Sequence, residues 1–460
     1  MSDFQHQADA VETIAAISTP PGRGGIGIVR LSGPLAASIA VQLVRLRNPL
    51  AHGRARFAEI PDGAGEGAER IDEALVTLFT APHSYTGEEL VEIAAHGSPV
   101  VLELLLRRAL ELGARLAEPG EFTHRAFVSG RLDLTQAEAV RDLIEAQTLT
   151  QARQAASQLG GSLSRRIFPV KHSLTELIAL MEAGIDFAED DVEVAPKEEI
   201  AGRIEALRPP LEALAASYSR GRIVHDGLTL AIVGRPNAGK SSLFNRLVER
   251  DRAIVTATPG TTRDLVTERI ALGGIPLELV DTAGLRETVE EIEQIGIARS
   301  REALADAALV LIVLDATQPI NEEEEKLFAA VAGRPALIAR NKSDLATAEL
   351  FAPPTGGLEV VETSALSGAG IAELREKLLA LATGGASSEP GMLTSLRHHQ
   401  AVETALNGLA DALEANGNGI PHEMILLDLY RALWALDSLT GQTTPDDILN
   451  LIFSSFCIGK

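Results

Sequence analysis

The sequence contains one cysteine, no long apolar run and fewer basic than acidic residues, and each shortage excludes a class of protein. A single cysteine in 460 residues cannot form an internal disulfide and is typical of a reducing cytoplasm. No stretch approaches the ~18–20 apolar residues of a membrane span. The first ten residues are polar and acidic, unlike a signal peptide. We therefore expect a cytoplasmic protein without a membrane segment.

The shortage of basic residues also limits how the chain could bind nucleic acid. Lys and Arg total 41 against 64 Asp and Glu, a formal net charge of −23. This charge argues against a broad basic surface but allows a local basic patch. Hydrophobic residues make up 45%, which is ample for packed cores. The length of 460 residues predicts two to four domains of about 100–200 residues each.

Residues 228–246, LTLAIVGRPNAGKSSLFNR, carry the most specific chemical signal in the chain. Thr229–Val233 predicts a buried strand, and residues 234–241 fit the phosphate-loop pattern G-x-x-x-x-G-K-[ST] before a helix. Glycines let backbone N–H groups close around phosphate oxygens, and the helix N-terminus adds a positive dipole. We expect Lys240 to reach the β- and γ-phosphates and the Ser241 hydroxyl to ligate Mg²⁺.

Three further motifs, each after a predicted strand, indicate that the nucleotide is GTP. Asp281-Thr-Ala-Gly284 is a D-x-x-G element, which senses Mg²⁺ and the γ-phosphate. The carboxylate of Asp344, in Asn-Lys-Ser-Asp, can accept two hydrogen bonds from guanine, whereas adenine lacks that donor pair. Ser364-Ala-Leu suits backbone contact to the guanine oxygen. The motifs supply these expected GTP-binding residues: Asn237, Ala238, Gly239, Lys240, Ser241, Ser242, Asp281, Thr282, Ala283, Gly284, Asn341, Lys342, Asp344, Ser364, Ala365 and Leu366.

Changes of pattern divide the chain into four segments. Residues 1–130 read as a compact α+β domain, and 131–226 as the first part of a helical domain. Residues 227–385 alternate strands and helices around the nucleotide motifs, and 386–460 are helical again after a small polar linker. The C-terminal helices are expected to pair with the earlier ones. The predicted fold class is therefore multidomain α/β and α, with a helical bundle split by an inserted Ras-like P-loop domain of mostly parallel sheet and helices on both faces.

Local signals add detail to this plan. Thr135-Gln-Ala-Glu138 fits a capping box and predicts a helix start. Pro209-Pro210 predicts an interruption of the helix that begins near Pro196. Arg30 and Glu92 stand inside apolar strand patterns and, from the residues alone, are most simply surface positions of strands.

Further motifs are distributed over nearly the whole chain. They are Pro20–Gly33 (PPGRGGIGIVRLSG), Thr86-Gly-Glu with His96-Gly97, Pro119–Leu134 (PGEFTHRAFVSGRLDL), Gly260–Asp264 (GTTRD), Asp281–Glu287 (DTAGLRE) and the ending Cys457-Ile-Gly-Lys460. Together they resemble the bacterial tRNA-modification GTPase family MnmE, also called TrmE. An isolated GTPase domain would not explain the motifs near the two ends.

The resemblance implies a specific function. In this family the N-terminal domain binds a tetrahydrofolate derivative and forms a homodimer. With the FAD-dependent partner MnmG (GidA), the family places a carboxymethylaminomethyl or aminomethyl group at C5 of the wobble uridine of certain tRNAs, using a folate one-carbon unit. The residues that match its folate contacts are Arg30, Glu92, Arg131 and Lys460. Arg131 stands where many relatives have Lys, which keeps the charge but not the geometry.

The resemblance also implies how GTP is hydrolysed. Many GTPases orient the attacking water with a Gln after D-x-x-G, but this chain has Leu285 there. The family assigns this task to a Glu that matches Glu293. From the residues alone, Glu293 could equally be one solvated acid in an acidic surface run, with no role in hydrolysis. The sequence shows no evident arginine finger, although Arg252, Arg263 and Arg286 are nearby and could serve. The family instead uses a potassium ion in that position once two G domains meet, and Thr262 is expected to ligate Mg²⁺ with GTP bound. The expected potassium ligands are Asn237, Thr256, Thr258 and Thr261, and Thr256, Thr261 and Thr262 also join the expected GTP contacts.

Two questions stay open at this stage. Cys457 could be a nucleophile, but a lone Cys at the end of an apolar helix is more often structural. Other classes of function also compete: a GTP-controlled switch in RNA or ribosome assembly, and a stand-alone folate-dependent one-carbon transferase regulated by GTP. The acidic net charge counts against the assembly switch, which would need a basic RNA-binding module. The absence of a flavin fingerprint counts against the stand-alone transferase, because it favours a chain that depends on a partner for redox chemistry.

Overall fold

The computed structural model describes residues 12–63, 67–186, 196–248, 267–281, 307–346, 357–383, 391–442 and 446–459. Contacts divide the chain into two compact units. One contains the residues up to 141 together with those from 437 onward, and the other contains residues 142–436. No helix within the described ranges is long and apolar enough to cross a membrane.

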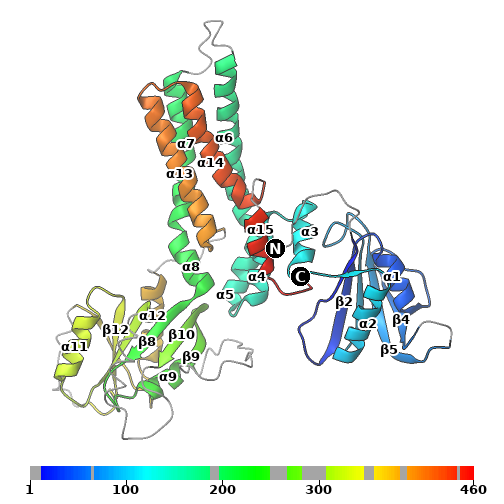
Figure 1. Cartoon of the computed structure of the whole chain (residues 1–460). Helices are drawn as coiled ribbons and strands as arrows, with labels where there is room; N and C mark the ends of the chain where they lie inside the picture. The colour runs from blue at the N-terminus through cyan, green and yellow to red at the C-terminus, as the bar shows by residue number, and fades with distance from the viewer. Residues whose placement is uncertain are drawn as a thin grey trace. The chain divides into compact units, whose positions relative to one another are not determined.

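The first unit is built on a seven-stranded sheet in the order β3-β4-β5-β6-β2-β1-β7 (Figure 1). Neighbouring strands are antiparallel except β1 and β7. The glycine-rich segment before β2 is therefore a hairpin connection. The strands are β1 (Ile14–Ile17), β2 (Gly24–Ser32), β3 (Arg45–Leu46), β4 (Ala55–Pro61), β5 (Arg70–Phe79), β6 (Leu90–Gly97) and β7 (Arg115–Leu116).

Helices α1 (Ala36–Leu43) and α2 (Pro99–Glu111) cover one face of this sheet. Every second residue along these strands points toward the two helices, and examples such as Val29, Val76 and Ile93 are fully buried beneath them. The side chains between these positions point to the opposite face. Arg30 and Glu92 belong to that second face, beyond the reach of α1 and α2.

The last helix of the chain packs within this unit. Helix α15 (Asp446–Ser454) contacts α3 (Glu121–Val128), and its Phe453 ring lies 4.8 Å from His124 and 6.3 Å from Phe127. Together with α4 (Leu134–Glu145) these helices bury a small apolar cluster that includes Leu134. Segments more than 300 residues apart therefore share one core.

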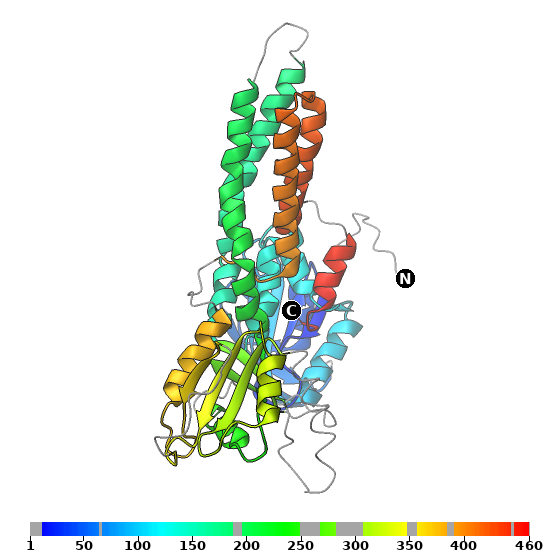
Figure 2. The ribbon, with the colours of Figure 1, turned by 90° about the vertical axis from the view of Figure 1, so that its left-hand side faces the viewer.

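The second unit contains a bundle of long helices that run side by side in both views (Figures 1 and 2). Helix α7 contacts α6 and α13, and Tyr430 of α14 donates a hydrogen bond to Glu182 of α6. The expected pairing of early and late helical segments is present. The helices of this part are α5 (Leu149–Leu159), α6 (Ser162–Asp186), α7 (Lys197–Ala216), α8 (Tyr218–Asp226), α13 (Leu396–Gly417) and α14 (His422–Thr440).

Between α8 and α13 the chain forms a six-stranded sheet in the order β13-β12-β11-β8-β10-β9. All pairs are parallel except β9 with β10. Helices α9 (Lys240–Val248) and α12 (Ile371–Thr383) pack on one face and α11 (Glu322–Ala330) on the other, so the predicted fold class is confirmed. The strands are β8 (Leu228–Val233), β9 (Thr267–Leu272), β10 (Ile275–Asp281), β11 (Leu309–Asp315), β12 (Ala336–Asn341) and β13 (Glu359–Glu362).

Two local predictions were wrong. The N-cap of α4 is Asp133, whose carboxylate accepts a hydrogen bond from the backbone N–H of Gln136, and the Gln136 amide oxygen accepts one from the backbone N–H of Asp133. Thr135 is already inside the helix. Helix α7 also continues through Pro209 and Pro210. An unbroken buried stripe, which includes Ile204, Leu207 and Leu211, compensates for the backbone hydrogen bonds that the prolines remove.

Candidate functional sites

The predicted nucleotide motifs meet at one edge of the second sheet. The phosphate loop follows the central strand β8, and Asp281 ends the adjacent β10. Asn341 ends β12, and Ser364 lies two residues beyond β13. Because these strands are parallel, their carboxyl ends lie together, where open α/β sheets bind ligands.

The phosphate loop has the backbone that a cradle for phosphate requires. Asn237 and Gly239 have φ values of +64° and +91°, which turn successive N–H groups inward. The amine of Lys240, a residue only 8% exposed, donates hydrogen bonds of 2.8 Å to the carbonyl oxygens of Gly234 and Arg235. Ser241 and Ser242 lie in the first turn of α9, where the helix dipole favours an anion.

Asn341 joins the predicted base loop to the phosphate loop. Its amide nitrogen donates to the carbonyl of Ala238 at 3.0 Å, and its amide oxygen accepts from the backbone N–H of Ala365 at 3.0 Å. The nitrogen lies so close to Gly239 that a Cβ there would come within 2.2 Å of it. One buried side chain therefore holds three of the predicted motifs together.

Two ion pairs that the sequence did not reveal brace the same loops. Arg235 donates from Nε and Nη2 to the two carboxylate oxygens of Glu324, at 2.7 and 2.9 Å. The Glu324 side chain is 1% exposed and also closes the capping box of α11 with Asn321. Lys342 similarly donates to Asp315, the last residue of β11, at 2.7 Å. An acid at the end of an apolar strand was the available sequence signal for Asp315.

The charge on Asp315 is maintained by its partners. Burial alone would raise the pKa of this carboxyl, but hydrogen bonds from Lys342 and Thr317 outweigh it and hold the pKa below its ordinary value. Asp344 is exposed beside this pair, with its carboxylate accessible, and Leu366 is 81% exposed. The Ser364 hydroxyl oxygen accepts from the N–H of Ser367 at 3.1 Å, which shapes the third loop.

Several predicted site residues lie outside the described residues, or are placed by backbone alone. Asp281 is placed as the end of β10, without its side chain. The following lie outside the described ranges: Thr256, Thr258, Thr261, Thr262, Thr282, Ala283, Gly284, Glu293 and Lys460.

In the first unit, two predicted folate residues form an ion pair on the sheet face opposite α1 and α2, where Phe122 of α3 packs against β1. Arg30 donates from Nε and Nη2 to Glu92 Oε1, at 3.0 and 2.7 Å. Its side chain is 16% exposed and lies 5.7 and 5.5 Å from the ring centres of Tyr85 and Phe122. Burial raises the pKa of the Tyr85 phenol. Arg30 and Glu92 are therefore half-buried partners in an ion pair, and not independent surface positions of their strands.

The C-terminal tail reaches this pair. Arg30 Nη1 donates to the carbonyl of Gly459 at 3.4 Å, and Ile458 forms a bridge with Pro119. Cys457 is exposed, and its carbonyl accepts from the N–H of Gly120 at 3.5 Å. Arg131 is exposed as well, and its side chain lies near Gly87. The predicted folate residues that the structure describes thus come from β2, β6 and the segment after α3.

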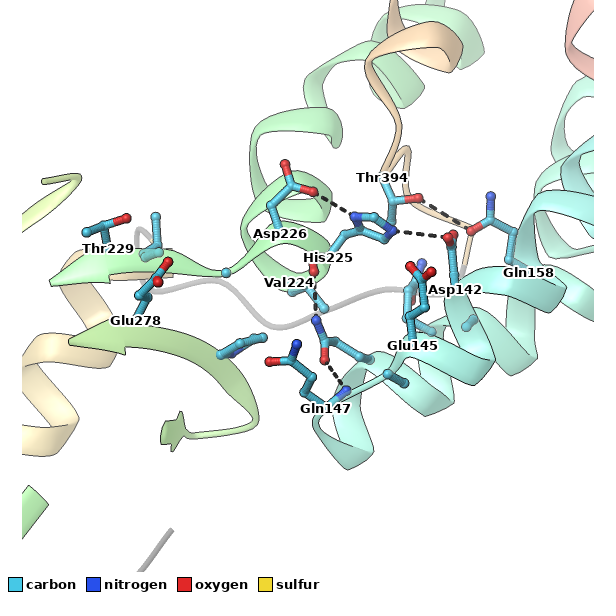
Figure 3. A pocket seen from close by; sticks show the side chains of 17 residues that line it. Asp142, Glu145, Gln147, Gln158, Val224, His225, Asp226, Thr229, Glu278 and Thr394 are labelled. Atoms are coloured by element: carbon cyan, nitrogen blue, oxygen red, sulfur yellow. Dashed lines mark hydrogen bonds and ion pairs between the residues drawn. The ribbon is translucent and has the colours of Figure 1, made fainter. Parts of the chain in front are cut away.

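A polar pocket of about 410 Å³ lies within the second unit, between the helical part and the sheet (Figure 3). Asp142 and Glu145 of α4 line it with Gln147 of the α4–α5 connection, and Thr229 and Glu278 line it from β8 and β10. His225 sits between two carboxylates: its Nε2 lies 3.3 Å from Asp142 and its Nδ1 lies 2.7 Å from Asp226. The hydrogen bond to Asp142 is the main cause that raises the pKa of His225 to about 9.

This histidine should make the stability of the second unit depend on pH. Because the folded pKa of about 9 exceeds the ordinary 6.5, the stabilisation is fully present below pH 6.5 and is lost as the pH rises through 9. The side chain is 35% exposed, so we expect a loss on the order of 1 kcal/mol. Urea midpoints of the full chain from pH 6 to about 9.5 should show this fall, and Asp142→Asn should flatten it. His172→Ala, at an exposed ion pair on α6, is the control and should keep the fall.

The strand order, the phosphate loop and the joined base loop define a P-loop GTPase domain, which is inserted in sequence into a helical domain that follows an α+β domain. The family model described as MnmE helical domain matches residues 134–457, and that described as GTP-binding protein TrmE N-terminus matches residues 13–131. The chain belongs to the MnmE family of tRNA modification GTPases, and therefore binds GTP and Mg²⁺ and hydrolyses GTP in tRNA modification.

Relatives of this name match along their whole length. The tRNA modification GTPase MnmE of Koribacter versatilis is 58% identical over 454 residues, covering 98% of this chain and 99% of its own. Those of Chloroflexus aurantiacus and Aquifex aeolicus are 44% and 41% identical, each covering 98% of this chain and 100% of their own. The solved G domain of the T. maritima FeoB iron transporter covers 34% of this chain and 98% of its own at 26% identity, with a TM-score of 0.26. The fold assignment rests on strand order, not on that likeness.

Proposed function

We propose that this GTPase, activated by potassium and by dimerisation, works with an FAD-dependent partner of the MnmG type. Together they install a carboxymethylaminomethyl or aminomethyl group at C5 of the wobble uridine of certain tRNAs, with a folate as one-carbon donor. The observation that carries most of the proposal is the convergence of the guanine-nucleotide motifs in one unit and of the Arg30–Glu92 pair with the C-terminal tail in the other.

The geometry of the nucleotide loops supports the roles of their residues. Lys240 would exchange its two carbonyl partners for the β- and γ-phosphates, while backbone N–H groups of residues 237–242 surround the phosphates. Ser241 would ligate Mg²⁺ together with Thr262. Asp281 and Gly284 would sense Mg²⁺ and the γ-phosphate. Asn341, Lys342, Asp344 and the loop 364–366 would hold the base, which the buried bonds of Asn341 already position.

For hydrolysis, we propose that Glu293 orients the attacking water, because Leu285 has no group that could. Potassium would stabilise the developing charge, with Asn237, Thr256, Thr258 and Thr261 as ligands. Of these four, Asn237 is the residue that the structure describes. It is exposed at the mouth of the phosphate loop, so its amide oxygen is accessible to a cation.

Potassium dependence gives a direct test of this arrangement. Asn237→Gly removes the amide oxygen and accepts the φ of +64° without strain, so nucleotide affinity should stay within about threefold. The stimulation of GTP hydrolysis by KCl over NaCl should fall by about tenfold or more. Rates would be measured at several protein concentrations, with Asn321→Gly, which removes the cap of α11 on the same domain, as the control. Equal stimulation in Asn237→Gly and the wild type would contradict the assignment.

For the folate site, we propose contacts from Arg30, Glu92, Arg131 and Lys460. The sheet face that carries Arg30 and Glu92 also exposes apolar side chains on β4 and β5: Phe57 is 40%, Ile71 42% and Leu75 52% exposed. This apolar surface supports the proposed homodimer through the N-terminal units. Cys457 lies beside the same tail, and we assign it no chemical step.

A cellular measurement tests the function as a whole. A strain whose only copy carries Glu92→Gln should lose the wobble-uridine modification by at least about tenfold, because Arg30 would lose its charged partner. Mass spectrometry of nucleosides from digested tRNA would measure this loss, and GTP hydrolysis by the purified variant should be unchanged. Glu73→Gln, at an exposed ion pair on β5, is the matched control. Normal modification in the Glu92→Gln strain would refute the proposed folate site.

A further inference from the structure

Three stretches of this acidic chain contain no Asp or Glu at all. They are residues 146–175, 213–225 and 391–402, and together they hold seven Lys and Arg. Acidic residues outnumber basic ones by 64 to 41 in the whole chain, so an excess of positive charge in these stretches stands out. They correspond to α5 with the start of α6, to α8, and to the start of α13.

The structure brings these stretches together at the base of the helical bundle, where α5 and α8 lie (Figure 1). Arg166 Nη1 donates to the carbonyl of Gly391 at 3.0 Å, and the N–H of Leu393 donates to Ser217 Oγ at 3.1 Å. The segment before α13, which contains Leu393, also passes close to α8: a Cβ on Gly221 of α8 would lie 1.9 Å from the Leu393 carbonyl oxygen. The three stretches are therefore neighbours in one part of the second unit.

Five arginines in this place have no carboxylate partner among the described residues. Arg165 and Arg166 donate to backbone carbonyls, at 2.5 and 3.0 Å. By contrast, arginines of the neighbouring α7 are paired with acids one helical turn away, such as Arg203 with Glu199 at 2.7 Å. We call the five unpaired residues the basic cluster: Arg153, Arg165, Arg166, Arg220 and Arg222. Arg153, Arg165 and Arg222 are exposed, and Arg166 and Arg220 are half-buried.

Acids are found at the C-terminal end of α8, where Asp226 lies one helical turn from Arg222. Asp142, Glu145, Asp226 and Glu278 line the pocket at the far end of α8, and two of them are bound to His225. A polyanion that meets the basic cluster would be repelled on that side. The cluster is consequently a local basic region bordered by acidic groups, not part of a broad field.

We propose that the basic cluster is the surface by which this chain contacts the phosphate backbone of tRNA. The inference rests on the tRNA-modification function of the family and adds the place of contact. Guanidinium groups bind phosphate oxygens with two hydrogen bonds in one plane, and uncompensated arginines supply the sequence-independent part of RNA affinity. With a net charge of −23, the chain repels RNA elsewhere, so the contact concentrates where acids are absent.

Binding of an unmodified tRNA transcript to the full-length protein tests this proposal. Fluorescence anisotropy would be recorded at 50–200 mM KCl without nucleotide. Arg153→Gln and Arg222→Gln should each weaken affinity about 3- to 10-fold and together about 10- to 100-fold. Each should also make the negative slope of log K against log salt shallower by roughly 0.7–0.9, because one phosphate contact is lost. GTP hydrolysis and the helical circular dichroism should stay as in the wild type.

Arg203→Gln, an exposed but paired arginine of α7, is the matched control and should change neither affinity nor slope. Unchanged tRNA affinity and slope in the double variant, or no binding by the wild type at 50 mM KCl, would overturn the proposal. Loss of binding to the FAD-dependent partner with tRNA affinity retained would overturn it too, in favour of a protein-docking surface. Each of these results can occur with GTP hydrolysis and the folate site intact, so they are distinguishable from failure of the proposed function.

Discussion

Lys240→Ala is expected to lower the rate of GTP hydrolysis by about 10²–10³-fold or more. The amine of Lys240 is buried inside the phosphate loop, where its positive charge is poorly screened, and it is positioned by two carbonyl oxygens. Such preorganised donors act mainly on charge that develops in the transition state. Single-turnover phosphate release would measure the rate, and titration with a fluorescent GTP analogue would measure the affinity.

Two further variants make this result specific. Lys326→Ala, an exposed lysine of α11 in the same domain, should leave both quantities unchanged. Lys240→Arg should restore little activity, because a planar guanidinium does not fit the two-carbonyl arrangement that holds an ammonium. A rate for Lys240→Ala within threefold of the wild type would contradict the assigned role.

The second large effect is a change of nucleotide. Asp344→Asn should weaken GTP binding by about 10²–10⁴-fold, because the side chain loses its charge and an NH₂ donor replaces one of the two oxygens that accept from guanine. Xanthine carries a carbonyl where guanine has the amino group, so the Asn amide can donate to it. We therefore expect XTP to be bound and hydrolysed by the variant. Competition of both nucleotides against a fluorescent GDP analogue would measure the switch.

This substitution should leave the fold intact, which isolates its effect on recognition. Asp344 is exposed, whereas the neighbouring Asn341 and the pair of Lys342 with Asp315 carry the structural contacts. The melting temperature should therefore stay within about 2 °C of the wild type. Retained GTP affinity, or the absence of XTP hydrolysis, would show that Asp344 does not read the base.

Features that depend on neighbouring residues could be predicted from the sequence. The phosphate loop is a contiguous pattern whose spacing is set by backbone geometry, and the alternation of apolar residues located the strands around it. The edge where the motifs meet also followed, since parallel strands place their carboxyl ends together. The fold class was predictable for the same reason.

Features that join distant residues could not be predicted in this way. Arg235 and Glu324 are 89 positions apart, and nothing local to either signals that they pair. Arg30 meets Gly459 across 429 positions, which only the tertiary fold reveals. Local rules also failed where tertiary packing decided the outcome: Pro209 and Pro210 stay helical because Leu207 and Leu211 are buried on either side of them.

The insertion of the GTPase domain has a consequence for synthesis of the chain on the ribosome. Helix α7 ends at Ala216, but its partner α13 begins at Leu396, so the bundle cannot close until almost the entire chain has been translated. All strands of the intervening sheet are translated before α13, so that domain can fold first. The apolar surface of α6 and α7 must therefore remain without its partners during that interval. A nascent chain halted before residue 396 would carry this surface exposed, which makes it a substrate for chaperones even though its GTPase domain is complete.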